Sequence, residues 1–242
     1  MILASLKMDA DTIIAGLLHD VVEDCEISLK TVKKEFGTNV AKLVDGMTKL
    51  LQLDDKLKDQ SQAEYFQKMA LATAEDVRVV IIKLADRLHN LQTIEHLPRE
   101  KQIKKARETL ELYAPLAHQI GMHKMATDLE DHAFKTIHPF RHKLIEQALK
   151  KNELNRKTLI SKVKKTLRAK FKKNEVPADT KGRRKRIYSI YQKMKSKHRS
   201  FGDIYDVFAF RVTVEKVEEC YKVLGIIPVS YTHLTLPTSS QV

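Results

Sequence analysis

The chain contains no tryptophan, only two cysteines, seven glycines and six prolines among 242 residues. Glycine and proline mark turns, so their scarcity favours helices over a loop-rich β fold. Cys25 and Cys220 lie far apart and form no CxxC pair, so the sequence indicates neither a zinc site nor a disulfide framework. This cysteine usage fits a reducing compartment, and we expect a cytoplasmic protein.

Long apolar runs are also missing. No stretch approaches the roughly 20 apolar residues of a membrane-spanning helix, and the N-terminus lacks the basic and then apolar pattern of a signal peptide. We therefore expect no membrane partner. Apolar residues nevertheless make up 43% of the chain, which is enough for a hydrophobic core in one or two domains.

Positive charge is abundant and unevenly distributed. The formal net charge is +13, and residues 141–199 hold 22 of the 44 lysines and arginines against four acidic residues. A solvated helix face is the commonest explanation of such a run, but the excess also attracts polyanions such as nucleotide polyphosphates or RNA. Aromatic residues are sparse before Tyr188, which argues against a general single-strand RNA surface.

The hydrophobic pattern predicts a mainly helical chain. Ser28 and Gly37 predict the start and end of a helix at 29–36. The other expected helices span 13–24, 39–50, 63–74, 75–94, 99–113, 123–136 and 140–173, with a short one between Pro115 and Gly121. We expect a loop at 49–62 and a linker at 176–179. β-Branched and aromatic residues at 204–214 predict a strand, followed by a short helix at 217–224.

One pair of motifs indicates chemistry. The His19–Asp20 doublet is followed one helical turn later by the Glu23–Asp24 pair, and Asp86 stands in a second polar block, Lys83–Asn90. Imidazole and carboxylate groups suit a divalent transition metal that activates water for attack on a phosphate ester or anhydride. Glu23 is four residues after His19, and Asp24 is four residues after Asp20, so each acid shares a helix face with one residue of the doublet. From there the acids can transfer protons.

Plainer explanations compete with this one. A His-Asp doublet alone is more often a capped or solvated helix face, and only the second block, Lys83–Asn90, shifts the balance towards a metal site. The apolar segment 77–86 fits a buried strand or a buried helix, and we expect a helix because the pattern continues through Leu91 without a breaker. His89 is better explained by packing or an outer-shell role than as a ligand.

Several separated motifs together resemble the RelA/SpoT homologues, the bacterial enzymes of guanosine tetra- and pentaphosphate, (p)ppGpp. The motifs are, in order, Leu17–Asp24, Glu35–Gly37, Leu43–Leu50 and Ile82–Asn90, and the resemblance runs from the start to about Ile227. It implies an all-helical HD-type hydrolase domain that binds manganese and removes the 3′-pyrophosphate from (p)ppGpp, leaving GDP or GTP.

The resemblance also implies roles for individual residues. The implied metal ligands are His19, Asp20 and Asp86. The implied catalytic acidic pair is Glu23 and Asp24, and the residues near the nucleotide are Asn90 and Thr93. The family has a further histidine ligand in a His-Pro motif just before the segment that matches 2–9, with basic residues upstream. We therefore expect an N-terminally truncated hydrolase domain with a weaker metal site and doubtful activity of its own.

A second motif, Gly182–Met194, combines cations with a hydroxyl. Alone it fits a solvated basic helix start or a nonspecific RNA patch as well as a phosphate site. It resembles the opening of the (p)ppGpp synthetase domain, which implies that Arg183, Lys185, Ser189 and Lys193 bind ATP. The same resemblance implies that Asp206 holds magnesium. Arg184 and Arg186 depart from the family pattern and receive no role.

These features predict the domain organisation. We expect a hydrolase domain at 1–138, a basic helical connector at 139–176, the beginning of an α/β nucleotidyltransferase-like synthetase domain at 177–227, and a non-native-looking tail at 228–242. ATP and GDP or GTP would be substrates of the complete enzyme, with the ribosome or its RNA as a further partner of the complete protein.

Two other functions fit the residues without the resemblance. One is an HD phosphohydrolase that acts on another nucleotide, which the synthetase-like motif argues against. The other is a non-enzymatic basic module at 139–200 that binds ribosomal RNA, for which salt-dependent binding without metal would be the evidence.

Overall fold

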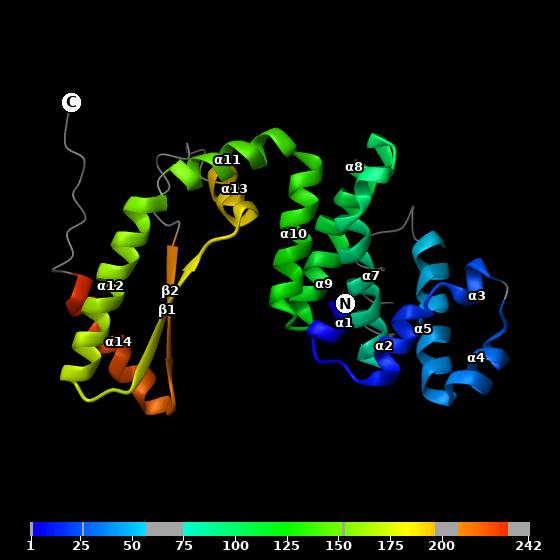
Figure 1. Ribbon diagram of the computed structural model, residues 1–242, viewed down its shortest axis with the longest axis horizontal. Coiled ribbons are helices and arrows are strands. Elements are labelled where there is room, and N and C mark those ends of the chain that lie inside the picture. The colour runs from blue at the N-terminus through cyan, green and yellow to red at the C-terminus, as the bar shows by residue number, and fades with distance from the viewer. Residues whose placement is uncertain (1, 26, 57–74, 152, 197–207, 232–242) are drawn as a thin grey trace. The chain divides into compact units, whose positions relative to one another are not determined.

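The computed structural model describes residues 2–25, 27–56, 75–151, 153–196 and 208–231 (Figure 1). The chain divides into two compact units, Met1–Pro139 and Phe140–Val242. Each unit is described by itself below. The finer division into hydrolase domain, connector and synthetase segment stays a prediction.

The first unit is helical throughout its described part, as the sequence predicted. Its elements are α1 (Ile2–Ser5), α2 (Ala10–Leu17), α3 (Val21–Asp24), α4 (Leu29–Phe36), α5 (Thr38–Lys56), α7 (Val77–Gln92), the 3-10 turn η1 (Ile94–His96), α8 (Arg99–Glu108), the π-helical turn η2 (Thr109–Tyr113), α9 (Ala114–Gln119) and α10 (His123–Ile137). None of the described helices in either unit combines the length and the apolarity needed to cross a bilayer.

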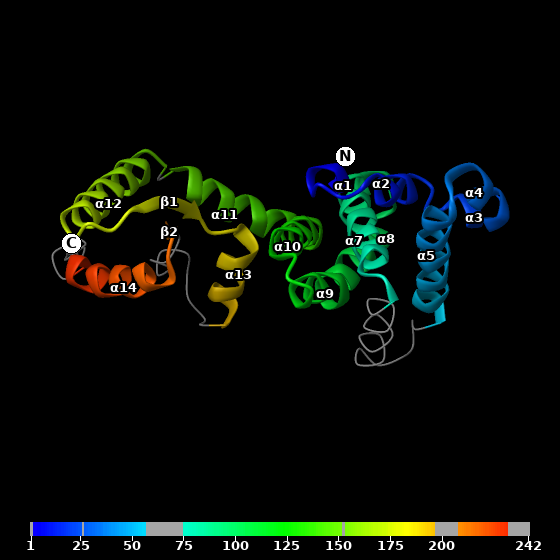
Figure 2. The same cartoon turned by 90° about the horizontal axis from the view of Figure 1, so that it is seen from below.

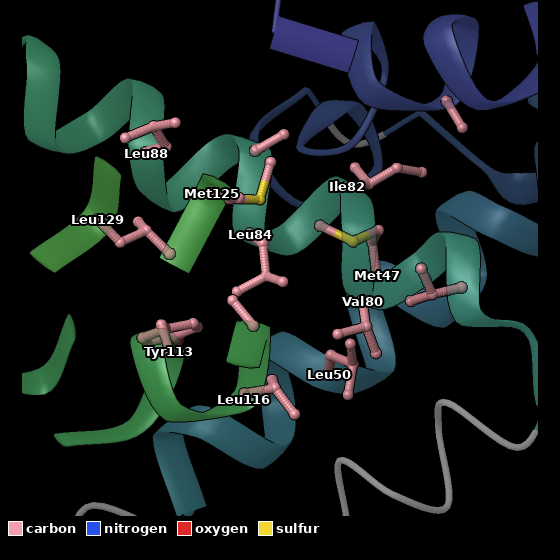
Figure 3. Close-up of a cluster of buried hydrophobic side chains, with 14 of the residues drawn as sticks. Met47, Leu50, Val80, Ile82, Leu84, Leu88, Tyr113, Leu116, Met125 and Leu129 are labelled. Atoms are coloured by element: carbon pink, nitrogen blue, oxygen red, sulfur yellow. The ribbon is translucent and has the colours of Figure 1, made fainter. Parts of the chain in front are cut away.

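Helix α7 forms the centre of this unit. It packs against α5 on one side and against η2 and α10 on another. Figure 3 shows Val80 of α7 beside Met47 and Leu50 of α5 at one end of the cluster, and Leu88 of α7 near Leu129 of α10 at the other end. Seven apolar residues of α7 are at most 5% exposed, which accounts for the long apolar run in the sequence: Val79, Val80, Ile82, Leu84, Ala85, Leu88 and Leu91. The helix predicted for this run is confirmed, and the strand alternative is wrong.

Local signals position several helix ends, and those of α4 lie where the sequence predicted. The Ser28 hydroxyl accepts a hydrogen bond from the backbone N–H of Thr31, and α4 ends at Gly37, whose φ of 91° suits glycine. The carboxylate of Asp76 likewise caps α7 by accepting from the N–H of Arg78. These caps satisfy N–H groups that have no partner within their own helix.

One predicted helix, 13–24, is wrong in its middle. The structure has α2 up to Leu17, a turn at 18–20, and a separate α3 from Val21. The apolar pattern continues through the turn, so periodicity alone gave no sign of the break. The cause is a side-chain hydrogen bond, described with the site below.

Other predicted boundaries also change. The loop expected at 49–62 is wrong for 49–56, which continue α5, whereas 57–62 and the helix expected at 63–74 lie outside the described residues. The helix expected at 99–113 is two elements, because its last turn, η2, is π-helical. The long helix expected at 140–173 is helical in all its described residues, as α11 (Pro139–Lys151) and α12 (Glu153–Lys173), and residue 152 between them lies outside the described residues.

The second unit combines helices with a two-stranded sheet. Strands β1 (Ala178–Arg184) and β2 (Phe208–Val214) pair antiparallel, with Thr180 opposite Val212. Helices α12 and α14 (Val217–Tyr231) pack against this sheet around Phe171 and Val223, and α13 (Ile187–Ser196) follows β1 (Figure 2). The predicted strand is confirmed for 208–214. The linker expected at 176–179 is wrong in part, since Val176 is buried and β1 begins at Ala178.

Candidate metal centre

His19 lies at the break between α2 and α3. In an unbroken helix the carbonyl oxygen of Gly16 would accept a hydrogen bond from the backbone of Asp20. Here it accepts instead from Nδ1 of His19, at 2.9 Å. The imidazole thus takes the place of a backbone partner, which explains both the interruption of the helix and the fixed direction of the ring.

Two carboxylates face the other ring nitrogen. Nε2 of His19 lies 2.8 Å from Oδ2 of Asp20 and 3.4 Å from Oδ1 of Asp86. Asp86 stands in the middle of α7, and its side chain is only 17% exposed. The Nδ2 amide of Asn90, one turn further along α7, donates to the same Oδ1 at 2.8 Å. The turn at 18–20 and α7 therefore bring His19, Asp20 and Asp86 together.

The bond to Gly16 determines which nitrogen of His19 carries a proton. Nδ1 must donate, because a carbonyl oxygen can only accept. In the neutral imidazole, Nε2 would then hold a lone pair directed at two carboxylates. That arrangement is repulsive unless a cation lies between the nitrogen and the oxygens, either a proton on Nε2 or a metal ion.

The pKa shifts of the metal-free protein agree with a cation between His19 and the two carboxylates. The hydrogen bond to Asp86 raises the pKa of His19, although burial acts against it. Burial would raise the pKa of Asp86, but the interactions with His19 and with the Lys83 ammonium outweigh burial, so the pKa of Asp86 is lowered. Burial raises the pKa of Asp20, and the charges of Asp86 and Asp24 raise it further, against the opposite effect of His19. Negative charge at this site is thus in excess.

The donor set has the chemistry of a divalent transition-metal site, with one imidazole nitrogen and two carboxylates. The described residues contain no group of three or more His, Cys, Asp or Glu side chains already spread around a cation position. At His19 the imidazole contacts both carboxylates directly through Nε2. A metal ion would have to displace the proton from Nε2, as is usual when histidine becomes a ligand.

The predicted catalytic acids, Glu23 and Asp24, lie on α3. Their backbone N–H groups donate to the carbonyl of Asp20 at 3.1 and 2.8 Å, which ties α3 to the proposed ligand. Both acids are exposed, and the charge of Asp24 reaches Asp20, whose pKa it raises. Their part in proton transfer stays a prediction.

The two residues predicted near the nucleotide lie at the C-terminal end of α7. Asn90 is bonded to Asp86, as described. Oγ1 of Thr93 donates to the backbone carbonyl of His89 at 3.1 Å, within the last turn of the helix. Both residues therefore lie on or beside the helix that carries Asp86, and their contact with a nucleotide stays a prediction.

Lys83 belongs to this site and was missed from the sequence. It is 5% exposed, and its charge lowers the pKa of both Asp86 and Asp20. Lysine is rarely buried without compensating charge. A lysine within the apolar run of α7, one turn before Asp86, therefore indicates a buried positive charge beside that carboxylate. The sequence motif includes Lys83 but assigns it no role.

The predicted ATP-binding residues lie in the second unit. Arg183 is in β1, opposite Ala209, and Lys185 directly follows the strand. Ser189 and Lys193 are four residues apart on α13 and so share a helix face. Asp206, the predicted magnesium ligand, lies outside the described residues. The ATP site stays a prediction.

Two family models match the chain. The model described as "HD domain" matches residues 1–123, about half of the sequence. The model described as "Region found in RelA / SpoT proteins" matches residues 182–238 and so extends beyond Ile227, the end of the resemblance in the sequence motifs.

Curated relatives match along nearly the whole chain. The guanosine-3′,5′-bis(diphosphate) 3′-pyrophosphohydrolase of Vibrio cholerae is 42% identical over 224 residues, and the bifunctional (p)ppGpp synthase/hydrolase SpoT of Escherichia coli K12 is 43% identical over 224 residues. The GTP pyrophosphokinase of Streptomyces coelicolor is 46% identical over 228 residues. Each comparison covers 93% of this chain.

The relatives are much longer proteins. The chain spans 32% of the length of the Vibrio and Escherichia proteins and 26% of the Streptomyces protein. Identity above 40% over so much of the sequence, together with both family models in one chain, leads to a single conclusion: this chain belongs to the RelA/SpoT family of HD-domain proteins.

Proposed function

We propose that the first unit carries the hydrolase site of a bifunctional (p)ppGpp synthetase/hydrolase and, with manganese, releases pyrophosphate from the 3′ position of (p)ppGpp. One observation carries the proposal. Nε2 of His19, with Nδ1 bonded to Gly16, faces the carboxylates of Asp20 and Asp86 at 2.8 and 3.4 Å. The names of the Vibrio and Escherichia relatives include this hydrolase activity, which supports the choice of substrate.

His19, Asp20 and Asp86 would hold the metal. A bound manganese ion would supply a Lewis acid that lowers the pKa of water and polarises the phosphate. Gly16 orients His19, and Asn90 orients Asp86 through its bond to Oδ1. Such supporting hydrogen bonds hold ligands in place and strengthen metal binding.

Glu23 and Asp24 would accept the proton that the attacking water loses. One water is consumed, the bond between the 3′ oxygen and the pyrophosphate breaks, and the products are pyrophosphate and GDP or GTP. Lys83 contributes a buried positive charge beside Asp86 and Asp20, which limits the build-up of negative charge when a polyphosphate approaches. Asn90 and Thr93 would contact the nucleotide.

The second unit would carry the start of the synthetase site. Its proposed ATP ligands are Arg183, Lys185, Ser189 and Lys193, and Asp206 would hold magnesium. The cation-rich segment around β1 and α13 supports this assignment, because lysine and arginine bind phosphates.

The experiment measures pyrophosphate release from (p)ppGpp with manganese and with EDTA. It uses the 242-residue chain and the same chain preceded by a family-like His-Pro segment, because the relatives are about three times longer. We expect manganese-dependent release and a preference for (p)ppGpp over GTP and other nucleotides. Absence of release from both forms would refute the proposal, and equal cleavage of other nucleotides would replace it with a general HD phosphohydrolase.

Variants separate the ligand role from the proton-transfer role. Asp86→Asn should weaken manganese binding. Glu23→Gln should preserve manganese binding and lower turnover by about 10²- to 10⁴-fold, the usual contribution of a general base. Glu100→Gln, an exposed change of the same kind on α8, is the matched control and should leave turnover unchanged.

A further inference from the structure

A second group of titratable side chains lies at the turn between α9 and α10, built from other elements than the His19 site. Helix α9 ends at Gln119, and Gly121, with a φ of 79°, lets the chain reverse before α10 begins at His123. This reversal places His118 of α9 beside His123. Glu130 lies two turns further along α10, on the side of His123.

The two imidazoles face each other through their Nδ1 atoms, which are 3.4 Å apart. Their ring centroids are 5.7 Å apart, and the rings are tilted by 46°. The separation of the two Nδ1 atoms is longer than the roughly 2.7–3.2 Å of an N–H···O hydrogen bond in proteins. Two imidazole nitrogens bound at roughly 2.0–2.1 Å to one tetrahedral ion are about 3.3–3.4 Å apart. The observed separation of 3.4 Å matches that of two ligands of one ion.

Glu130 directs one of these nitrogens. Its Oε1 lies 3.3 Å from Nε2 of His118, and its side chain is 19% exposed. A carboxylate can only accept here, so Nε2 carries the proton and the lone pair of His118 lies on Nδ1, towards His123. A carboxylate behind a histidine ligand is a common supporting arrangement at metal sites.

We propose that His118 and His123 bind one divalent transition metal ion of the class that prefers imidazole, such as zinc, and that Glu130 is the positioning residue for His118. The described residues offer no third His, Cys, Asp or Glu in a common cluster, so water completes the coordination. The ion joins the end of α9 to the start of α10. This site is independent of the proposed hydrolase activity.

The test is a zinc titration of the full chain followed by NMR of the assigned imidazole nitrogens, which separates these histidines from His19. We expect the signals of His118 and His123 to shift together with one apparent affinity. His118→Asn should abolish the response of His123, and His123→Asn that of His118. His96→Asn, an exposed histidine of η1, is the matched control and should leave both responses unchanged.

Independent behaviour of the two histidines would overturn the proposal. It would appear as different zinc affinities, or as a response of one histidine that survives when the other is asparagine. Glu130→Gln should weaken zinc binding by about 10- to 100-fold and alter the tautomer of His118 reported by its nitrogen shifts. An unchanged tautomer and affinity would remove Glu130 from the site. Far-ultraviolet circular dichroism checks that each variant keeps its helices.

Discussion

At the scale of single residues, the central observation is that Nε2 of His19 faces the carboxylates of Asp20 and Asp86. The sequence motif named His19, Asp20 and Asp86, but it could not place Asp86 against His19, because that contact depends on how α7 packs in the core. The burial of Lys83 depends on the same packing. The sequence pattern also could not predict the bond from His19 to Gly16, since a side chain that replaces a backbone N–H donor leaves the hydrophobic periodicity unchanged.

A pH prediction follows for the metal-free protein. The raised pKa of His19 stabilises the fold fully below its unfolded value of about 6.5, and this contribution is lost as pH rises through the folded pKa. The lowered pKa of Asp86 stabilises the fold at pH values above about 3.9, and this contribution is lost as pH falls through the folded pKa. The pair therefore contributes most between about pH 4 and 6.5.

In EDTA, loss of the stabilising contribution of His19 should lower the melting temperature of the first unit as pH rises above about 6.5. Asp86→Asn should flatten this fall, because His19 then loses its partner. Asp45→Asn, at a surface ion pair with Lys49 on α5, is the control and should keep the slope of the parent chain. Equal slopes in Asp86→Asn and the parent would show that the pair does not titrate as described.

At the scale of elements, helix α7 sets the position of Asp86, and the close approach of α5 helps to fix α7. A Cβ added at Gly46 of α5 would lie 2.8 Å from Cγ2 of Val79. Val79 is 5% exposed and β-branched, so its side chain has little freedom to move. The glycine at this position therefore permits contact between the two helices.

Gly46→Ala should destabilise the first unit by about 1–3 kcal/mol through overpacking, even though alanine favours helices. Gly225→Ala is the matched control, because Gly225 lies inside α14 and no atom of the described residues lies within 4 Å of the added Cβ. It should stabilise the second unit by up to about 1 kcal/mol. Urea unfolding followed by circular dichroism measures both, and a stabilising Gly46→Ala would contradict the packing described.

The elements also show how far sequence reasoning extends. Helix α4 was predicted to the residue, because Ser28 and Gly37 mark its ends chemically. Strand β1 was missed, because lysine, arginine and glycine make up most of Ala178–Arg184 and its pairing with β2 comes from a segment some thirty residues later. Helices with local caps were thus predictable, whereas a polar strand that depends on a distant partner was not.

At the scale of the whole molecule, the two units have separate cores. The core of the first unit runs from Ala15 to Ala133, and that of the second consists of Val163, Leu167, Phe171, Val176 and Val223. Because each unit contains its own cluster of buried apolar residues, calorimetry should show two unfolding transitions. Manganese should raise only the transition of the first unit, in proportion to its binding free energy. A single transition that moves as one with manganese would contradict this division.

The central claim is that His19, Asp20 and Asp86 hold one cation, and the most direct test is a manganese titration followed by electron paramagnetic resonance of the unbound ion. The parent chain should bind manganese, and its affinity should fall at low pH as His19 takes up its proton. Asp86→Asn should lower the affinity at least about tenfold, with Asp45→Asn unchanged. Identical manganese affinity in the parent, His19→Asn and Asp86→Asn would contradict the account.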